Sequence, residues 1–66
     1  MTGTITRLIE NRQVASIAAE DGYDYVFAAS ALRGVQFHQL SLGTSVSFTP
    51  RQTTTERHAE FVRLGV

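Results

Sequence analysis

Apolar and polar residues alternate with a period of two along several short segments of this 66-residue chain. Such alternation places apolar side chains on one face of an extended strand and polar side chains on the other. The pattern predicts strands over residues 4–9, 25–28, 44–49 and 58–64. Residues 14–19 are a further candidate; their alanine content also permits a helix, but the Asp21-Gly22 that follows is typical of a hairpin turn. We therefore expect five short strands.

The connection after the third strand contains residues typical of a short helical turn. Ser30 can cap its start and Gly34 can end it, and a loop over residues 35–42 closes at Gly43. Proline has no backbone N–H to donate, so we expect Pro50 to end the fourth strand and residues 51–57 to form a loop. Five short strands, interrupted after the third, predict an all-β fold: a small five-stranded antiparallel OB-type β-barrel that takes up residues 1–66 as a single domain.

Composition narrows the classes of protein that remain. The chain has no cysteine, so neither disulfides nor thiolate metal sites can stabilise it. Hydrophobic residues make up 42% of the chain, enough for a packed core. The sequence contains no apolar run near the roughly 20 residues that a membrane helix needs, and no basic-then-apolar signal pattern at its N-terminus. We expect a soluble, cytoplasmic protein that makes no contact with membranes.

The order of turn and apolar residues resembles the bacterial cold-shock domain over nearly the whole chain. The matching residues are Met1, Thr2, Gly3, Thr4, Ile5, Ile17, Asp21, Gly22, Asp24, Ser30, Ala31, Leu32, Phe37, Leu40, Gly43, Val46, Phe48, Ala59, Val62 and Leu64. Their spacing fits the family with almost no gaps. The resemblance implies an OB-type barrel that binds single-stranded RNA or DNA.

Departures from the family concern the aromatic side chains on which unpaired bases stack. The two ribonucleoprotein motifs of the family correspond here to residues 12–17 (RQVASI) and 25–29 (YVFAA), and its first-strand tryptophan and phenylalanine fall at Arg7 and Leu8. Each stacked base is worth about 1–3 kcal/mol, so the loss of these rings predicts much weaker binding. The inward positions keep their apolar character, and we expect them to fill the barrel: Ile5, Ala15, Ile17, Tyr25 and Phe27.

Charge gives little support to nucleic-acid binding. Six arginines balance six acidic residues, so the excess of positive charge that is typical of nucleic-acid binders is absent. The charges are nevertheless unevenly spread along the chain. Acidic residues gather over residues 20–24, and arginines gather over residues 7–12 and 51–63.

Five residues are candidates for contacts with nucleic acid. Arg7 can stack on a base or bind a phosphate, and Arg12, at the position of the family's motif lysine, can meet a phosphate. The alternative, which the pattern favours for both, is a solvated surface arginine. Ser16 lies beside Arg7 on the substituted face. Phe37 matches the one base-stacking aromatic that the chain keeps, or is a loop ring folded onto the barrel edge. His38 beside it can add stacking or charge, or be an ordinary surface histidine.

Enzyme chemistry has no candidate residues. Glu20, Asp21 and Asp24 lie on a tight turn with nothing to bury them, so we expect no carboxylate there to be tuned for acid–base catalysis. His38 and His58 are the only histidines, and no cluster of ligands has metal spacing. We expect a non-enzymatic domain without metal or cofactor.

Two functions remain open. The first is weak, salt-sensitive binding of single-stranded RNA or DNA with little sequence preference. The second is a protein-interaction or homodimerisation module that kept the barrel and replaced the stacking face by a contact face. The small apolar side chains of Val14, Val26, Ala28 and Ala29 favour the second function, because an apolar patch with a polar rim is typical of an interface.

Overall fold

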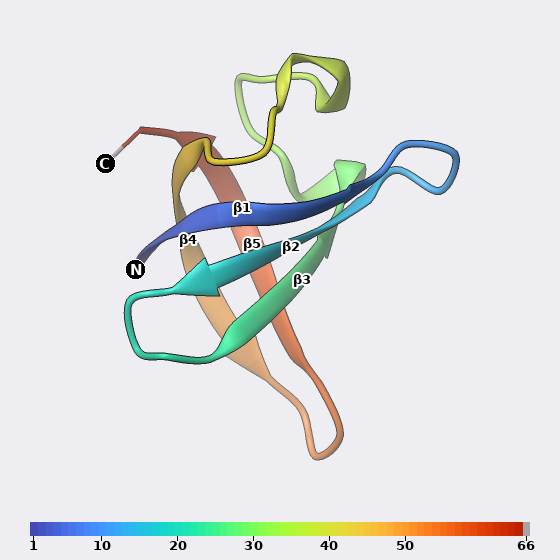
Figure 1. The fold of residues 1–66 in the computed structure, drawn as a ribbon. Coiled ribbons are helices and arrows are strands. Elements are labelled where there is room, and N and C mark those ends of the chain that lie inside the picture. Colours follow the sequence, from blue (N-terminus) through green and yellow to red (C-terminus); the bar gives the residue numbers. More distant parts are fainter. Residues whose placement is uncertain (66) are drawn as a thin grey trace.

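The computed structural model describes residues 1–65, which form a closed barrel of five strands (Figure 1). In chain order the elements are β1 (Thr2–Ile9), β2 (Val14–Ala19), β3 (Asp24–Ala28), the 3₁₀ helices η1 (Ala29–Ala31) and η2 (Phe37–Gln39), β4 (Ser45–Gln52) and β5 (Arg57–Leu64). The predicted all-β class is confirmed, and five strands in so short a chain fit an OB-type barrel. Neither helix in residues 1–65 has the length or apolar character needed to cross a membrane.

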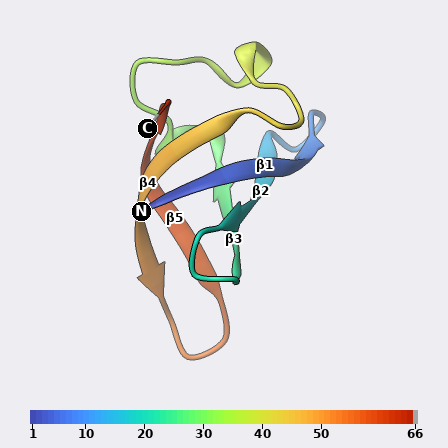
Figure 2. The ribbon, with the colours of Figure 1, turned by 60° about the vertical axis from the view of Figure 1, so that its left-hand side comes forward.

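Strand order around the barrel is β1-β2-β3-β5-β4, with β4 pairing back onto β1. Four of the pairings are antiparallel, as expected, but β3 and β5 run parallel and meet at Val26 and His58. A parallel pair needs a long connection between its strands. Part of that connection, the segment with η1 and η2, lies over one end of the barrel (Figures 1 and 2).

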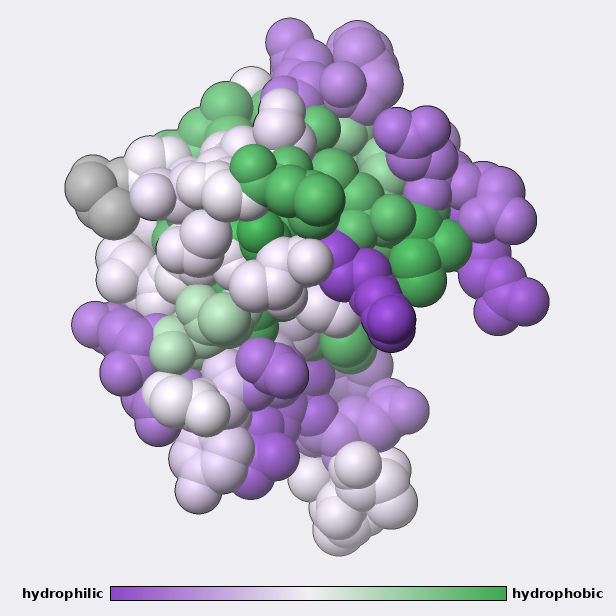
Figure 3. Space-filling view, viewed as in Figure 1, coloured by the Kyte–Doolittle hydropathy of each residue, from purple (hydrophilic) through white to green (hydrophobic). Residues whose placement is uncertain are grey.

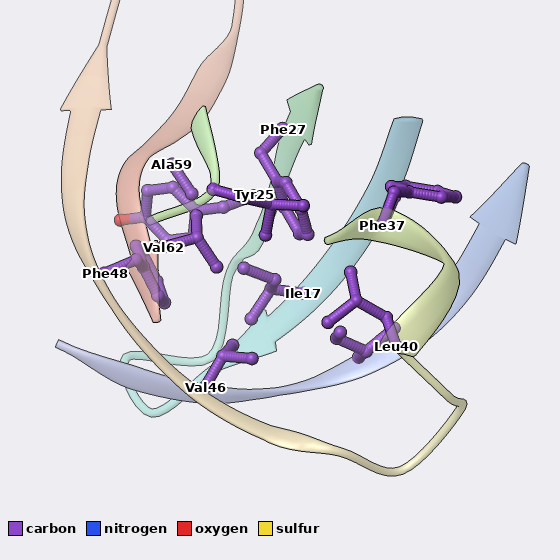
Figure 4. Close-up of a cluster of buried hydrophobic side chains, with 12 residues drawn as sticks. Ile17, Tyr25, Phe27, Phe37, Leu40, Val46, Phe48, Ala59 and Val62 are labelled. Carbon is purple, nitrogen blue, oxygen red and sulfur yellow. The ribbon is translucent and has the colours of Figure 1, made fainter. Parts of the chain in front are cut away.

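The core follows from the alternation along β2 and β3 and from Ile5 in β1, after which an irregularity between Ile5 and Arg7 shifts the register of β1. The five residues expected to point inward are all at most 3% exposed, so the predicted register is confirmed. Residues from β4, β5 and the long connection complete the cluster (Figure 4). Its members are Ile5, Ala15, Ile17, Tyr25, Phe27, Leu32, Phe37, Leu40, Val46, Phe48, Ala59 and Val62.

Two local expectations are wrong, for separate reasons. Pro50 lies inside β4, opposite Ala59, instead of ending the strand, so the loop expected over residues 51–57 shortens to residues 53–56. Beyond Ser47 no residue of β4 pairs with β1, so the missing N–H of Pro50 faces an unpaired edge and costs no ladder bond. Ser30 is not a cap, because η1 starts one residue earlier and its N-cap, Ala28, makes no side-chain hydrogen bond. The helix η2 was not anticipated.

The turn between β2 and β3 is held by the carboxylate of Asp21. Its Oδ2 accepts a hydrogen bond of 2.7 Å from the Tyr25 hydroxyl, and its Oδ1 accepts one of 3.0 Å from the Tyr23 backbone N–H. These bonds, chiefly the one from Tyr25, lower the pKa of Asp21 from its ordinary value of 3.8. The bond to Asp21, helped by desolvation, raises the pKa of Tyr25 from its ordinary value of 10.0.

We expect the bond between Tyr25 and Asp21 to stabilise the fold fully between those two ordinary values and progressively less outside them. Asp21, with its lowered pKa, contributes stability that is present above pH 3.8 and is lost as the pH falls through its folded pKa. Tyr25, with its raised pKa, contributes stability that is present below pH 10.0 and is lost as the pH rises through its folded pKa. Urea unfolding of the wild type and of Tyr25→Phe across pH measures this contribution. A stability difference that does not change with pH would show that the variant acts through packing alone.

Candidate functional site

The outward side of β1, β2 and β3 forms a surface that we call the β1–β3 face. Cross-strand pairing arranges it in rows: Arg7 lies opposite Ser16, which lies opposite Val26. In the next row Ile9 lies opposite Val14, which lies opposite Ala28. A third row, in which Thr4 lies opposite Ala18 and Ala18 opposite Asp24, lies at the other end of these strands. The β1–β3 face is therefore made of Thr4, Arg7, Ile9, Val14, Ser16, Ala18, Asp24, Val26 and Ala28.

A shallow hollow of about 310 Å³ lies on this face. Its lining is mainly apolar, and Figure 3 shows hydrophobic surface over the part of the barrel nearest the β1–β2 turn, bordered by hydrophilic side chains. Arg7 and Ser16 supply its polar groups. The structure thus brings two of the five predicted site residues together, as neighbours across β1 and β2. The hollow is lined by Arg7, Ile9, Val14, Ala15, Ser16 and Val26.

Arg7 is the one basic side chain of the β1–β3 face and is exposed to solvent, as is the acidic Asp24 at the other end of the face. Within residues 1–65 the ion pairs are Arg51 with Glu60 at 3.0 Å and His58 with Glu56 at 2.6 Å. Neither pair involves Arg7, so its charge is not neutralised by a contacting carboxylate. An exposed arginine on an apolar floor can bind a phosphate while the floor contacts a base.

Arg12 lies at the tip of the β1–β2 turn, next to the face but outside the hollow. The turn is closed by a hydrogen bond of 3.2 Å from the Gln13 backbone N–H to the Glu10 carbonyl. Gln13 has a φ of 53°, the left-handed conformation that such a turn requires. Arg12 is exposed and forms neither of the ion pairs described above, so its positive charge is also not neutralised by a contacting carboxylate.

Phe37 and His38 lie elsewhere, on η2. Together with the β1–β2 turn they line a second hollow of about 450 Å³. Phe37 packs in the core and is only 7% exposed, so little of its ring is open to a base, whereas His38 is exposed. Base stacking by Phe37 stays a prediction. Phe37→Ala would remove core contacts, so it would not separate binding from folding.

Two exposed aromatic rings were not among the predicted site residues. Tyr23 is 51% exposed, with the guanidinium carbon of Arg57 at 3.9 Å from its ring centroid. Phe61 is 49% exposed, with the guanidinium carbon of Arg33 at 5.1 Å. Both pairs join residues far apart in sequence. No pattern of neighbouring residues in the sequence predicts these two arginine–aromatic pairs.

Side chains suited to metal binding do not assemble in the part of the chain described. Residues 1–65 contain no cluster of three or more histidines, cysteines, aspartates or glutamates that could hold a metal ion. Glu20 and Asp21 in the β2–β3 turn are exposed, as is Asp24, which the structure places at the start of β3. Asp21 is committed to the turn by its two hydrogen bonds.

Comparisons with known proteins leave the family of this chain open. Neither the protein-family models nor the curated protein sequences contain a match to it.

Proposed function

We propose that this chain is a non-enzymatic, cold-shock-like domain that binds single-stranded RNA or DNA weakly across its β1–β3 face. The observation that carries the proposal is the position of Arg7: exposed, opposite Ser16 and without a carboxylate partner, above an apolar hollow. In this mode the guanidinium of Arg7 binds a phosphate, and a base lies against the floor made by Val14 and Val26. Arg12 offers a second charge at the adjacent turn.

Binding of this kind is weak, because the β1–β3 face carries no aromatic ring. Aliphatic side chains cover part of a base, but they lack the flat surface that makes stacking worth about 1–3 kcal/mol per base. Arginine contacts to phosphate carry no sequence information, so little base preference is expected. Much of the binding free energy then comes from the release of counterions and falls as salt rises.

Replacing Arg7 by alanine tests the proposal. We expect Arg7→Ala to weaken binding of a fluorescein-labelled oligodeoxythymidine and to reduce the slope of log K against log salt by about 0.7, the value for one phosphate contact on a single strand. Fluorescence anisotropy at several salt concentrations measures both quantities. Arg51→Ala is the control, since it removes the same charge from an arginine held by Glu60. Equal losses in the two variants would contradict a contact at Arg7 and point to net charge alone.

The apolar lining of the same hollow favours a second function, docking of another protein chain or a second copy of this one. A modest apolar surface with Arg7 and Ser16 at its rim suits a weak protein interface. Light scattering over a range of protein concentrations distinguishes the two functions. A mass that rises with protein concentration, together with no binding of the oligonucleotide, would favour self-association over nucleic-acid binding as the function of this surface.

A further inference from the structure

Phe61 on β5 exposes a large apolar side chain to solvent, and its backbone adopts an unfavourable conformation. Its ring is 49% exposed and its φ is 52°, in the left-handed region that bulky residues rarely adopt. The pairing of β4 with β5 is irregular here: Ser47 faces Arg63 and Thr49 faces Glu60, so two residues of β5 oppose one of β4. The extra residue lets Val62 stay 0% exposed while Phe61 turns outward.

Arg33 is held over the Phe61 ring by backbone hydrogen bonds. Its Nη1 donates to the carbonyls of Ser30 at 3.0 Å and Leu32 at 2.9 Å, and its backbone N–H donates to the Val62 carbonyl at 2.9 Å. The guanidinium carbon lies 5.1 Å from the ring centroid. This arginine is therefore preorganised beside the ring, with little side-chain entropy left to lose on binding a ligand.

Charge distinguishes Phe61 from the other exposed ring. An arginine also lies over the ring of Tyr23, but Tyr23 is close in sequence to Glu20, Asp21 and Asp24, whose negative charges repel a phosphate. Near Phe61 the exposed charges are Arg33 and, two residues along β5, Arg63; neither forms one of the ion pairs found in residues 1–65. The nearest carboxylate in sequence, Glu60, is paired with Arg51.

We infer that Phe61, Arg33 and Arg63 form a base-stacking site for single-stranded nucleic acid on β5, separate from the β1–β3 face. A base stacks on the open part of the Phe61 ring, and the two arginines bind the flanking phosphates. β5 lies behind β1 and β2 in the view of Figure 1, so a strand bound there does not need Arg7. The inference rests on the proposed function for its ligand and gives that ligand the aromatic contact that the β1–β3 face lacks.

Anisotropy titration of the full chain with a fluorescein-labelled oligodeoxythymidine tests the site. Phe61→Asn removes the ring and keeps a residue that tolerates positive φ, so the fold should survive, which a thermal melt followed by circular dichroism verifies. We expect the Kd to rise at least about fivefold in Phe61→Asn, in line with the low end of stacking energies. Phe61→Tyr, which keeps an aromatic ring at this position, should bind with the Kd of the wild type. Tyr23→Asn is the matched control and should leave the Kd unchanged.

The outcomes separate this site from the proposed function. Weaker binding in Phe61→Asn, with normal binding in Arg7→Ala, would support the β5 site and overturn binding across the β1–β3 face. Normal binding in Phe61→Asn, with weaker binding in Arg7→Ala, would overturn the β5 site alone. If the folded wild-type chain binds no oligonucleotide, both proposals are overturned.

Discussion

Phenylalanine placed together at positions 14, 16 and 26 is expected to tighten binding of single-stranded nucleic acid by about a hundredfold, if three stacking energies at the low end of about 1 kcal/mol each add. Val14, Ser16 and Val26 all point outward from neighbouring strands, with Ser16 directly opposite Val26. Three rings there would rebuild a continuous platform for bases around Arg7. The expected change is the largest that we predict for binding.

The barrel should accept these rings, because the three positions are exposed or half-buried and phenylalanine is favoured in strands. Anisotropy with the labelled oligonucleotide measures the gain. Thr49→Phe, an outward and exposed position on β4, is the control for a general effect of an added ring. An unchanged Kd in the triple variant would show that the strand does not cross the β1–β3 face. Self-association of the triple variant would appear in light scattering and has to be excluded first.

The parts of the fold that sequence reasoning predicts well are those in which each strand alternates without interruption. In β2 and β3 every second residue, from Ala15 and Ile17 to Tyr25 and Phe27, faces the core as predicted. The side chains of such strands can bury their apolar atoms in one register only, because a slip by one residue would expose all of them. The outward position of Ser16 follows from the same register. Arg7 faces outward because an irregularity between Ile5 and Arg7 interrupts the alternation of β1, which the sequence pattern does not predict.

Sequence reasoning fails where a tertiary contact overrides the local pattern. Strict alternation from buried Ala59 would bury Phe61 and expose Val62, but the bulge in β5 does the reverse. The adjacent apolar pair Phe61-Val62 is the only sequence signal of this change. Pro50 is tolerated in β4 because the edge beside it has no partner, a fact that only the strand order reveals.

The candidate site also has a part that the sequence predicts and a part that only the folded structure reveals. Pairing of β1 with β2 places Arg7 opposite Ser16, on the face where the resemblance to the cold-shock domain puts both residues. The burial of Phe37 depends on η2, which folds over the barrel end and carries no strong local signal. The pair of Phe61 and Arg33 joins β5 to the segment after η1, so it becomes visible only when the barrel is closed.

Gly3→Ala is expected to destabilise the barrel by about 3 kcal/mol, the upper part of the usual range for overpacking. Gly3 pairs with both Ala19 of β2 and Val46 of β4, so both neighbouring strands approach it closely. A Cβ atom at this position would lie 2.4 Å from Cγ2 of Ile17 and 2.7 Å from the carbonyl oxygen of Ala18. The oxygen belongs to the backbone of β2, and Ile17 is fully buried, so neither atom can move away without opening the barrel.

A loss of this size is large for so small a domain, whose total stability is about 3–10 kcal/mol by its length. Gly22→Ala is the matched control, because its φ of 86° makes alanine strained while the space around it is open. Strain alone should cost about 1–2 kcal/mol there, so urea unfolding should rank Gly3→Ala as the more destabilised variant. The reverse ranking would mean that β1 and β2 separate easily at Gly3. The barrel would then depend less on the close approach of these strands than on its core, because Gly3 is the glycine of residues 1–65 at which an added Cβ atom would come closest to neighbouring atoms.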